Sequence, residues 1–197
     1  GRLTGARDEL ERAVALELCP ALGVAIPVGK DSMSMQTRWR DGAAEHAVIS
    51  PVSLIVSAFV HVPDVRHALT PLLRLDRGPT RLLWLDLSAG RLRLGASALA
   101  QVYGQLGNDA PDVDDPARLA KFLATVRELA LDRTLLAYHD LGDGGLFATL
   151  AEMSLAARCG LDVTLPEGAT ALATLFAEEL GAVVQVGAVD AARVATA

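Results

Sequence analysis

The stretch of sequence with the clearest chemical potential is a glycine-rich loop with two carboxylates, at residues 139–145 (HDLGDGG). The apolar run 135–138 (LLAY) before it predicts a buried strand, and a helix is predicted to begin at Leu146. Glycines permit a tight turn and a close approach of the backbone to a ligand. Asp140 and Asp143 could together hold Mg²⁺, which is usually bound by one or two carboxylates with phosphate oxygens and water.

The predicted helix start adds a second reason to consider a phosphate ligand here. The first N–H groups of a helix have no partner within the helix and carry a partial positive charge. An ordinary strand-to-helix turn explains the same residues, with Asp143 as the cap of the helix. The loop alone therefore leaves a magnesium and phosphate site and a simple turn as alternatives.

A second stretch with possible chemistry lies at residues 29–32 (GKDS), after a short strand predicted at 22–28. It departs twice from the phosphate-binding P-loop pattern, because Val24 stands where the first glycine belongs and Asp31 follows the lysine. A strand-end loop with these side chains still suits a charged ligand, and an exposed turn is the alternative. The residues concerned are Gly29, Lys30, Asp31 and Ser32.

Composition limits the possible functions. The 197 residues suffice for one large domain or two small ones, and the 51% hydrophobic content predicts a substantial aliphatic core. A net charge of −6 without a basic patch argues against binding to nucleic acid. Cys19 and Cys159 are the only two cysteines in a chain of this size and suggest no disulfide framework, so we expect a reduced, cytoplasmic protein. No signal peptide is visible, and no apolar run reaches the roughly 18 residues of a membrane span.

The ends of the sequence suggest a piece of a longer protein. The chain begins at Gly1 without a methionine and ends at Ala197 within a predicted helix. A strong turn at 76–79 (DRGP) predicts a domain boundary, which divides the chain into residues 1–75 and 76–197.

The elements that must position the two loops follow from hydrophobic periodicity and turn residues. The run at 48–62 has apolar residues at both its even and its odd positions, so both faces of a strand would be apolar. This pattern predicts a strand that is buried on both faces. The other elements predicted before the boundary are a helix at 7–18, a strand at 22–28 and a hairpin at 36–47 that turns at Asp41-Gly42.

After the boundary, strands and helices alternate loosely, and no G-x-G-x-x-G motif is present. Asp115 and Pro116 predict the start of a helix, and the residues before them form an acidic loop that is most simply solvated. The pattern predicts an α+β fold in two packed layers. Further strands are predicted at 81–87, 161–165 and 182–189, and further helices at 96–106, 146–158 and 170–180.

Three stretches together resemble one protein family. They are 26–35 (IPVGKDSMSM), 137–145 (AYHDLGDGG) and 176–186 (FAEELGAVVQV). Their order, their spacing and above all the run GKDSMSM are similar to the large, single-chain form of phosphoribosylformylglycinamidine synthase, the amidotransferase of de novo purine synthesis. The resemblance extends over nearly the whole chain.

The resemblance implies two-layer α/β domains of the aminoimidazole-ribonucleotide-synthetase type. Residues 1–75 would be the C-terminal part of an A-type domain, and 76–197 most of a B-type domain, both from the second synthetase half. The complete enzyme would use ATP, glutamine and formylglycinamide ribonucleotide to make the amidine. ATP would phosphorylate the amide oxygen of the substrate, and ammonia from a glutaminase domain outside this chain would displace the phosphate. This chain alone would be inactive.

The resemblance also assigns residues to a nucleotide site, although it assigns no catalytic residue. Asp140 matches an aspartate that ligates Mg²⁺ beside bound ATP or ADP. Gly142 stands where the family usually has a serine that contacts the nucleotide, so a hydroxyl is missing. Glu178 and Glu179 match a pair of glutamates for which we expect only a structural role or a role in supporting the residues that contact the ligand. The phosphate-lining loop of the family matches Gly29, Lys30, Asp31 and Ser32.

Two alternatives remain for the function. In the large form the second nucleotide site is thought to hold ADP as a structural element, so the chain could be a non-catalytic ADP- and Mg²⁺-binding module. It could also come from a sister enzyme such as aminoimidazole ribonucleotide synthetase, although the GKDSMSM run argues against that.

Overall fold

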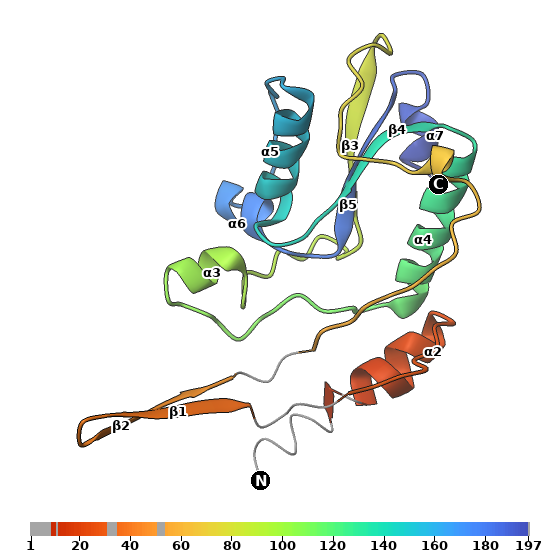
Figure 1. Ribbon diagram of the computed structural model, residues 1–197. Coiled ribbons are helices and arrows are strands. Elements are labelled where there is room, and N and C mark those ends of the chain that lie inside the picture. Colours follow the sequence, from red (N-terminus) through yellow and green to blue (C-terminus); the bar gives the residue numbers. More distant parts are fainter. Residues whose placement is uncertain (1–8, 11, 31–34, 51–53, 197) are drawn as a thin grey trace. The chain divides into compact units, whose positions relative to one another are not determined.

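The computed structural model describes residues 9–10, 12–30, 35–50 and 54–196, and it divides the chain into two compact units, Gly1–His61 and Val62–Ala197 (Figure 1). This division lies earlier in the sequence than the boundary expected at 75/76. The segment 62–75 packs within the second unit, where Leu73 belongs to the core and the carbonyl of Thr70 accepts a hydrogen bond from the Tyr138 amide (3.0 Å). The DRGP turn is therefore a turn inside the second unit.

The first unit contains a short helical segment and a hairpin. Strands β1 (Gln36–Asp41) and β2 (Ala44–Ile49) pair antiparallel with Asp41 opposite Ala44, which confirms the predicted hairpin but moves its turn by one residue, to 42–43. The π-helix η1 (Arg12–Leu18) and α2 (Cys19–Ala21) form within and just after the predicted helix. The expected strand at 22–28 is wrong, because this segment has no regular structure.

The long apolar run of the first unit differs from its prediction. The strand expected at 48–62 stops at Ile49, and residues 54–62 are exposed and without regular structure. Ile55 and Phe59 are 90% and 94% exposed. A strand requires a neighbour for its backbone N–H and C=O groups, and the described residues of this unit offer none beyond the hairpin.

The second unit is built on an antiparallel sheet of order β3-β5-β4, formed by Thr80–Asp86, Gly181–Gly187 and Leu135–Asp140 (Figure 1). The central strand β5 is buried over residues 182–186, as its position between two neighbours requires. The helical elements around this sheet are η2 (Val65–His67), α3 (Ala98–Val102), α4 (Pro116–Leu131), α5 (Gly145–Ala157), α6 (Ala171–Phe176) and α7 (Ala191–Val194).

Alternate residues of β5 enter two hydrophobic clusters, because successive side chains of a strand point to opposite faces. Val183 packs with Leu146 and Met153 of α5. Val184 and Val186 pack with residues of α4 and α7. Helices thus cover both faces of the sheet, which adds a third layer to the two that the sequence pattern predicts; the α+β class is confirmed.

Most elements of the second unit match the sequence pattern, with two informative exceptions. Residues 161–165 form no strand. The helix expected at 170–180 ends at Phe176, and Ala177 is extended. This early end places Glu178 and Glu179 outside the helix, where their carboxylates reach other segments. No helix in the described part of the chain is both long enough and apolar enough to cross a membrane.

Candidate functional site

The HDLGDGG loop connects the end of β4 at Asp140 to the start of α5 at Gly145, as the sequence predicts. Gly144 and Gly145 have φ values of +86° and +61°, a region that favours glycine. A Cβ atom on Gly145 would lie 2.6 Å from the carbonyl oxygen of Ala177. Gly145 is therefore required by the close packing of the segment after α6 against the loop.

Gly142 has a different environment from the other glycines of the loop. Its φ lies outside the left-handed region, and no atom lies within 4 Å of the position that a Cβ would take. Nothing in the local backbone or packing requires glycine there. A side chain such as that of serine would be accommodated.

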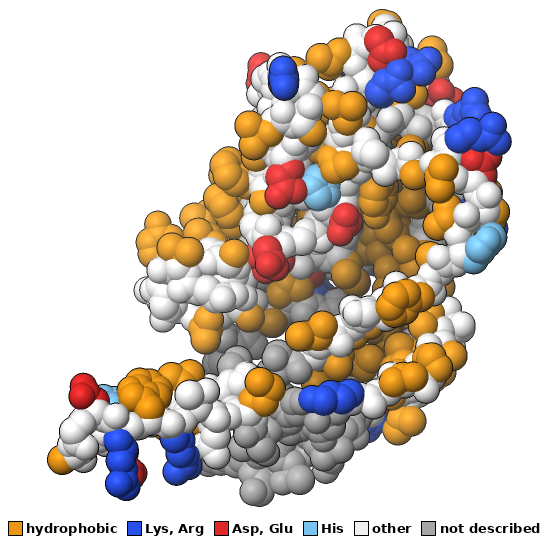
Figure 2. Space-filling view, in the orientation of Figure 1, with side chains coloured by type: hydrophobic (Ala, Val, Ile, Leu, Met, Phe, Trp, Pro, Cys, Tyr) orange, Lys and Arg blue, Asp and Glu red, His pale blue; other side chains and the backbone are white. Residues whose placement is uncertain are grey.

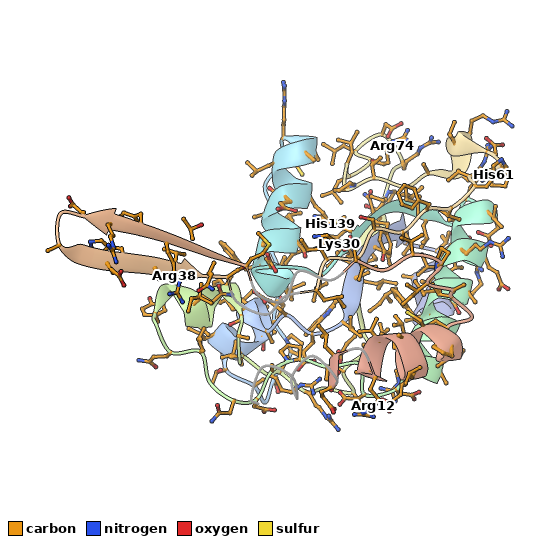
Figure 3. The ribbon with its side chains drawn as sticks, turned by 60° about the horizontal axis from the view of Figure 1, so that its bottom comes forward. Arg12, Lys30, Arg38, His61, Arg74 and His139 are labelled. Atoms are coloured by element: carbon orange, nitrogen blue, oxygen red, sulfur yellow. The ribbon has the colours of Figure 1, made fainter. Side chains whose placement is uncertain are left out.

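The carboxylate of Asp140 is open to solvent at the end of β4. Its side chain is 74% exposed, and the Nδ1 atom of His139 lies 3.6 Å from its Oδ1. His139 is mostly buried beside α5 (Figure 3), and its Nε2 lies 2.5 Å from Oε2 of Glu152 in that helix. Figure 2 shows acidic side chains gathered around a histidine on this face of the second unit. The Glu152 contact fixes the imidazole and was not expected from the sequence, because thirteen positions and a turn separate the two residues.

The residues around Asp140 fit a metal only in part. An exposed carboxylate is the type of ligand that Mg²⁺ takes. Among the described residues, however, no group of three or more His, Cys, Asp or Glu side chains could hold a metal ion. Mg²⁺ at Asp140 would therefore need most of its ligands from phosphate oxygens and water, which is its usual manner of binding in nucleotide sites.

The start of α5 is capped by a residue from a distant part of the chain. Asp143 does not cap the helix, because the N-cap is Gly144, which makes no side-chain capping bond. The Gly144 amide instead donates to Oε1 of Glu178 (2.7 Å), and the same oxygen accepts from the Ala98 amide at the start of α3 (2.8 Å). One carboxylate thus joins the loop of Asp140 to the beginning of α3.

Glu179 forms a second, more deeply buried contact. Its side chain is 2% exposed, and its two oxygens accept from Nε and Nη2 of Arg93, each at 2.7 Å. Nη2 of Arg93 also donates to Asp114 (2.8 Å), so the acidic loop is not simply solvated. These carboxylates raise the pKa of Arg93. The carboxylates of Glu178 and Glu179 thus both connect segments that are distant in the sequence.

Arg93 is a residue that the sequence reasoning missed. Its signal is indirect: two adjacent glutamates between apolar residues, Ala177 and Leu180, require a partner if they are buried. The sequence contains many arginines, and nothing local distinguishes Arg93 from Arg91, whose side chain is 56% exposed.

The second predicted stretch belongs to the first unit. Gly29 and Lys30 are exposed there, and Asp31 and Ser32 lie outside the described residues. Asp140 and Gly142 belong to the second unit. The two predicted stretches therefore lie in different units, and each is described by itself.

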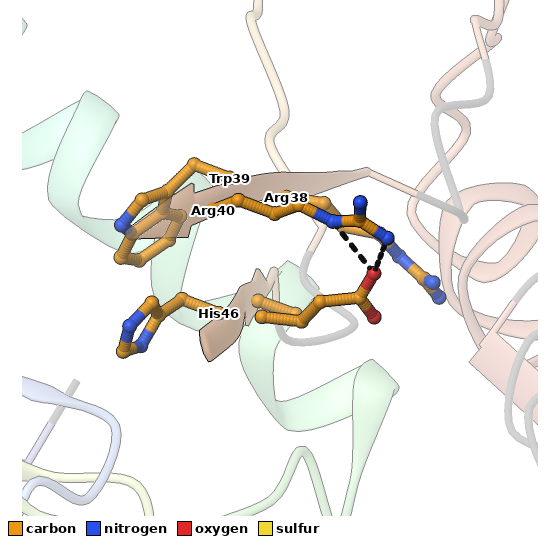
Figure 4. A pocket seen from close by; sticks show the side chains of 6 residues that line it. Arg38, Trp39, Arg40 and His46 are labelled. Carbon is orange, nitrogen blue, oxygen red and sulfur yellow. Dashed lines mark hydrogen bonds and ion pairs between the residues drawn. The ribbon is translucent and has the colours of Figure 1, made fainter. Parts of the chain in front are cut away.

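Asp140 lines neither of two surface pockets found in the described part of the chain. One, of about 600 Å³, is on the β1–β2 hairpin, where Trp39 stacks on His46 with ring centroids 5.2 Å apart and Arg40 pairs with Glu45 (Figure 4). The other, of about 450 Å³, is lined by α3, the loop after it and Leu172. Neither contains a residue of the two predicted stretches, so the loop chemistry, and not pocket size, defines the candidate site.

Comparison with known proteins gives two family matches along the chain. Residues 8–61 match the family described as the FGAR-AT PurM_N-like domain, and residues 82–196 match the C-terminal domain of AIR synthase related proteins. A similar solved structure is that of "T. maritima PurL complexed with ATP", at 12% sequence identity and a TM-score of 0.45. That match covers 77% of this chain, which spans only 22% of the other chain. Since the second family match extends over more than half of the sequence, this chain belongs to the family of AIR synthase related proteins.

Proposed function

We propose that this chain is part of the large, single-chain form of phosphoribosylformylglycinamidine synthase. The observation that carries the proposal is the order of the two matches, a FGAR-AT PurM_N-like domain at 8–61 followed by an AIR synthase related C-terminal domain at 82–196. The first match favours this enzyme over a sister such as aminoimidazole ribonucleotide synthetase. The complete protein would convert formylglycinamide ribonucleotide to the amidine with ATP and glutamine, as a cytoplasmic C–N ligase.

In this proposal the chain contributes a nucleotide site around Asp140. The exposed Asp140 carboxylate would hold Mg²⁺ against the phosphates of ATP or ADP, and a bound Mg²⁺ would neutralise phosphate charge. The amides of Leu141, Gly144 and Gly145 are hydrogen-bonded to Gly181, Glu178 and Gly142 respectively.

Between Asp140 and α5, the amides of Gly142 and Asp143 have no hydrogen-bond partner among the described residues, and we propose them as the phosphate contacts of the loop. Gly29, Lys30, Asp31 and Ser32 would line a phosphate-bearing ligand in the first unit. Other domains would supply the glutaminase and the ammonia that it releases.

A second candidate function is a structural ADP site that is not turned over. Two observations favour it over a catalytic site. Gly142 offers no hydroxyl to a nucleotide, and the loop is held by Glu178 and by the close packing at Gly145. Tightly held ADP would stabilise the folded protein by mass action.

One experiment tests both candidates. The intact enzyme is purified without added nucleotide and denatured, the released nucleotide is identified by chromatography, and bound Mg²⁺ is counted. Stoichiometric ADP that survives turnover supports the structural site, and exchangeable nucleotide supports a catalytic one.

The Asp140→Asn variant separates the two candidates further. If the site is structural, the Asp140→Asn substitution lowers thermal stability more strongly than it lowers kcat. If the site is catalytic, kcat falls while thermal stability is unchanged. Failure of the intact enzyme to form the amidine from ATP, glutamine and formylglycinamide ribonucleotide would reject the proposed enzyme.

A further inference from the structure

The loop between β4 and α5 has a carboxylate at the position where a phosphate would otherwise meet the helix. Oε1 of Glu178 accepts from the Gly144 amide at 2.7 Å, and Gly144 is the N-cap of the 13-residue helix α5. Helix N-termini favour negative charge because their first N–H groups are unpaired and the helix dipole is positive there. Glu178 therefore satisfies the preference of this helix end with a group of the protein itself.

Glu178 is also held from a second direction, so its position does not depend on α5 alone. The same oxygen accepts from the Ala98 amide at 2.8 Å, and Ala98 begins α3. Its neighbour Glu179 is anchored by the buried contact with Arg93. The segment 175–177 packs so closely against Gly145 that a Cβ atom on Gly145 would overlap with carbonyl oxygens of that segment. These contacts hold the carboxylate of Glu178 at the loop.

Among the described residues, four carboxylates lie on this loop or contact its residues. Asp140 and Asp143 lie on the loop, Glu178 bonds to its backbone, and Glu152 contacts the adjacent His139. The guanidinium of Arg93, which contacts the neighbouring Glu179, is also paired with Asp114. A polyphosphate that approaches without a cation would be repelled by these carboxylates.

We propose that Glu178 is a specificity-determining and positioning residue of the nucleotide site: its carboxylate occupies the N-terminus of α5 and makes binding conditional on a divalent cation. The inference rests on the proposed function, because it takes the loop of Asp140 as the nucleotide site. Glu178 discriminates against metal-free nucleotide by charge, and it fixes the loop by its hydrogen bonds. These two roles can be separated by substitution.

Glu178→Gln separates them because its amide oxygen still accepts from the Gly144 and Ala98 amides while the negative charge is removed. Calorimetric titrations of the full-length protein compare Mg·ADP with ADP in the presence of EDTA. We expect Glu178→Gln to bind metal-free ADP roughly five- to tenfold more tightly than the wild type, with the affinity for Mg·ADP changed less than about twofold. Glu128→Gln, on the exposed surface of α4, removes an equal charge elsewhere and should change neither affinity.

Hydrogen exchange supplies a readout of the positioning role. The Gly144 and Ala98 amides should stay protected in Glu178→Gln and lose protection in Glu178→Ala. An unchanged ratio of the two ADP affinities in Glu178→Gln, with both amides still protected, would overturn the inference. Loss of protection at both amides in Glu178→Gln would also count against it, because a change in affinity would then follow from the displaced loop and not from the missing charge.

The proposed function fails in a different way. If Asp140→Asn binds Mg·ADP as tightly as the wild type does, or if the wild type binds no ADP under either condition, the loop is not the nucleotide site. If Asp140→Asn weakens Mg·ADP binding and Glu178→Gln leaves the preference for metal unchanged, the site stands and only the role of Glu178 is wrong.

Discussion

The guanidinium of Arg93 meets the carboxylate of Glu179 in a two-pronged contact, Nε to Oε1 and Nη2 to Oε2, with both distances at 2.7 Å. The side chains are 9% and 2% exposed. The Arg93 amide donates to the same glutamate, so one acidic residue holds both the backbone and the side chain of another segment. Because the two residues are 86 positions apart, this contact fixes the segment before α3 to the segment after α6.

Removal of one partner of this pair should destabilise the second unit strongly. Glu179→Leu leaves a guanidinium without its main partner, and the loss of one member of a buried ion pair is costly. We expect the melting temperature of the full-length protein to fall by roughly 6–12 °C, measured by calorimetry. The double variant Arg93→Met/Glu179→Leu should recover most of this loss, because an apolar pair of similar volume needs no charge compensation.

Arg91 offers a matched control for the buried pair. It contacts Asp114 at 2.6 Å with its side chain 56% exposed, so Arg91→Met removes an ion pair at the surface. Such pairs contribute little, and the melting temperature should change by less than about 2 °C. A fall as large as that of Glu179→Leu would show that Asp114, and not Glu179, is the important partner in this region.

The local sequence pattern predicts those helices and strands that are determined mainly by their own residues. Runs of apolar residues predict the three strands of the second unit, and the Asp115-Pro116 pair predicts the start of α4, where Asp115 accepts from the amides of Ala117 and Arg118. The apolar run at 54–62 shows where this reasoning fails. Its hydrophobicity indicates a preference for burial, yet a strand also depends on a neighbour that no local pattern reveals.

The candidate site was likewise predictable only where neighbouring residues determine it. The strand end at Asp140 and the helix start after the glycines follow from the sequence around them. The capping of α5 by Glu178 does not, because Glu178 and Gly144 are 34 positions apart. The helical pattern at 170–180 placed both glutamates in a last turn. Their bonds to Ala98, Gly144 and Arg93 favour the extended backbone seen there instead.

The two glycines at positions 142 and 145 should differ sharply in their tolerance of a methyl group. Gly145→Ala would bring a Cβ to 2.6 Å from the Ala177 carbonyl oxygen at a φ of +61°. We expect a loss of more than about 2 kcal/mol in the free energy of unfolding, measured by urea denaturation. Gly142→Ala meets no atom within 4 Å and should change it by less than about 0.5 kcal/mol. Equal effects of the two substitutions would contradict the close packing of the loop against the segment after α6.

Asp64 should contribute stability that is lost in acid. Hydrogen bonds from the side chain and the backbone of Arg66 lower its pKa from the usual 3.8 to about 2. A carboxylate with a lowered pKa stabilises the folded state fully above its unfolded pKa, and the contribution disappears as the pH falls through the folded pKa. Wild type should therefore be more stable than Asp64→Asn above about pH 4, and the difference should vanish near pH 2, as measured by urea unfolding across this range.

The matched control for Asp64 is Asp162→Asn. Asp162 is exposed and has no hydrogen-bond partner among the described residues. This substitution should leave the acid limb of the stability curve unchanged. If Asp64→Asn also leaves it unchanged, the contact between Asp64 and Arg66 contributes nothing in solution.

Gly142→Ser should strengthen nucleotide binding without altering the fold. The position has room for a side chain and an ordinary backbone conformation, so the cost to folding is small. A serine hydroxyl would add one hydrogen bond to a bound nucleotide, which corresponds to a gain of roughly three- to tenfold in affinity for Mg·ADP. Calorimetric titration measures the affinity, and Gly142→Ala serves as the control that adds the Cβ without the hydroxyl.

If serine and alanine give the same affinity, the hydroxyl does not reach the nucleotide, and the amides of Gly142 and Asp143 remain the proposed phosphate contacts of the loop. If Gly142→Ser weakens binding, the nucleotide approaches the backbone at Gly142 too closely for any side chain, and the glycine is itself part of the site.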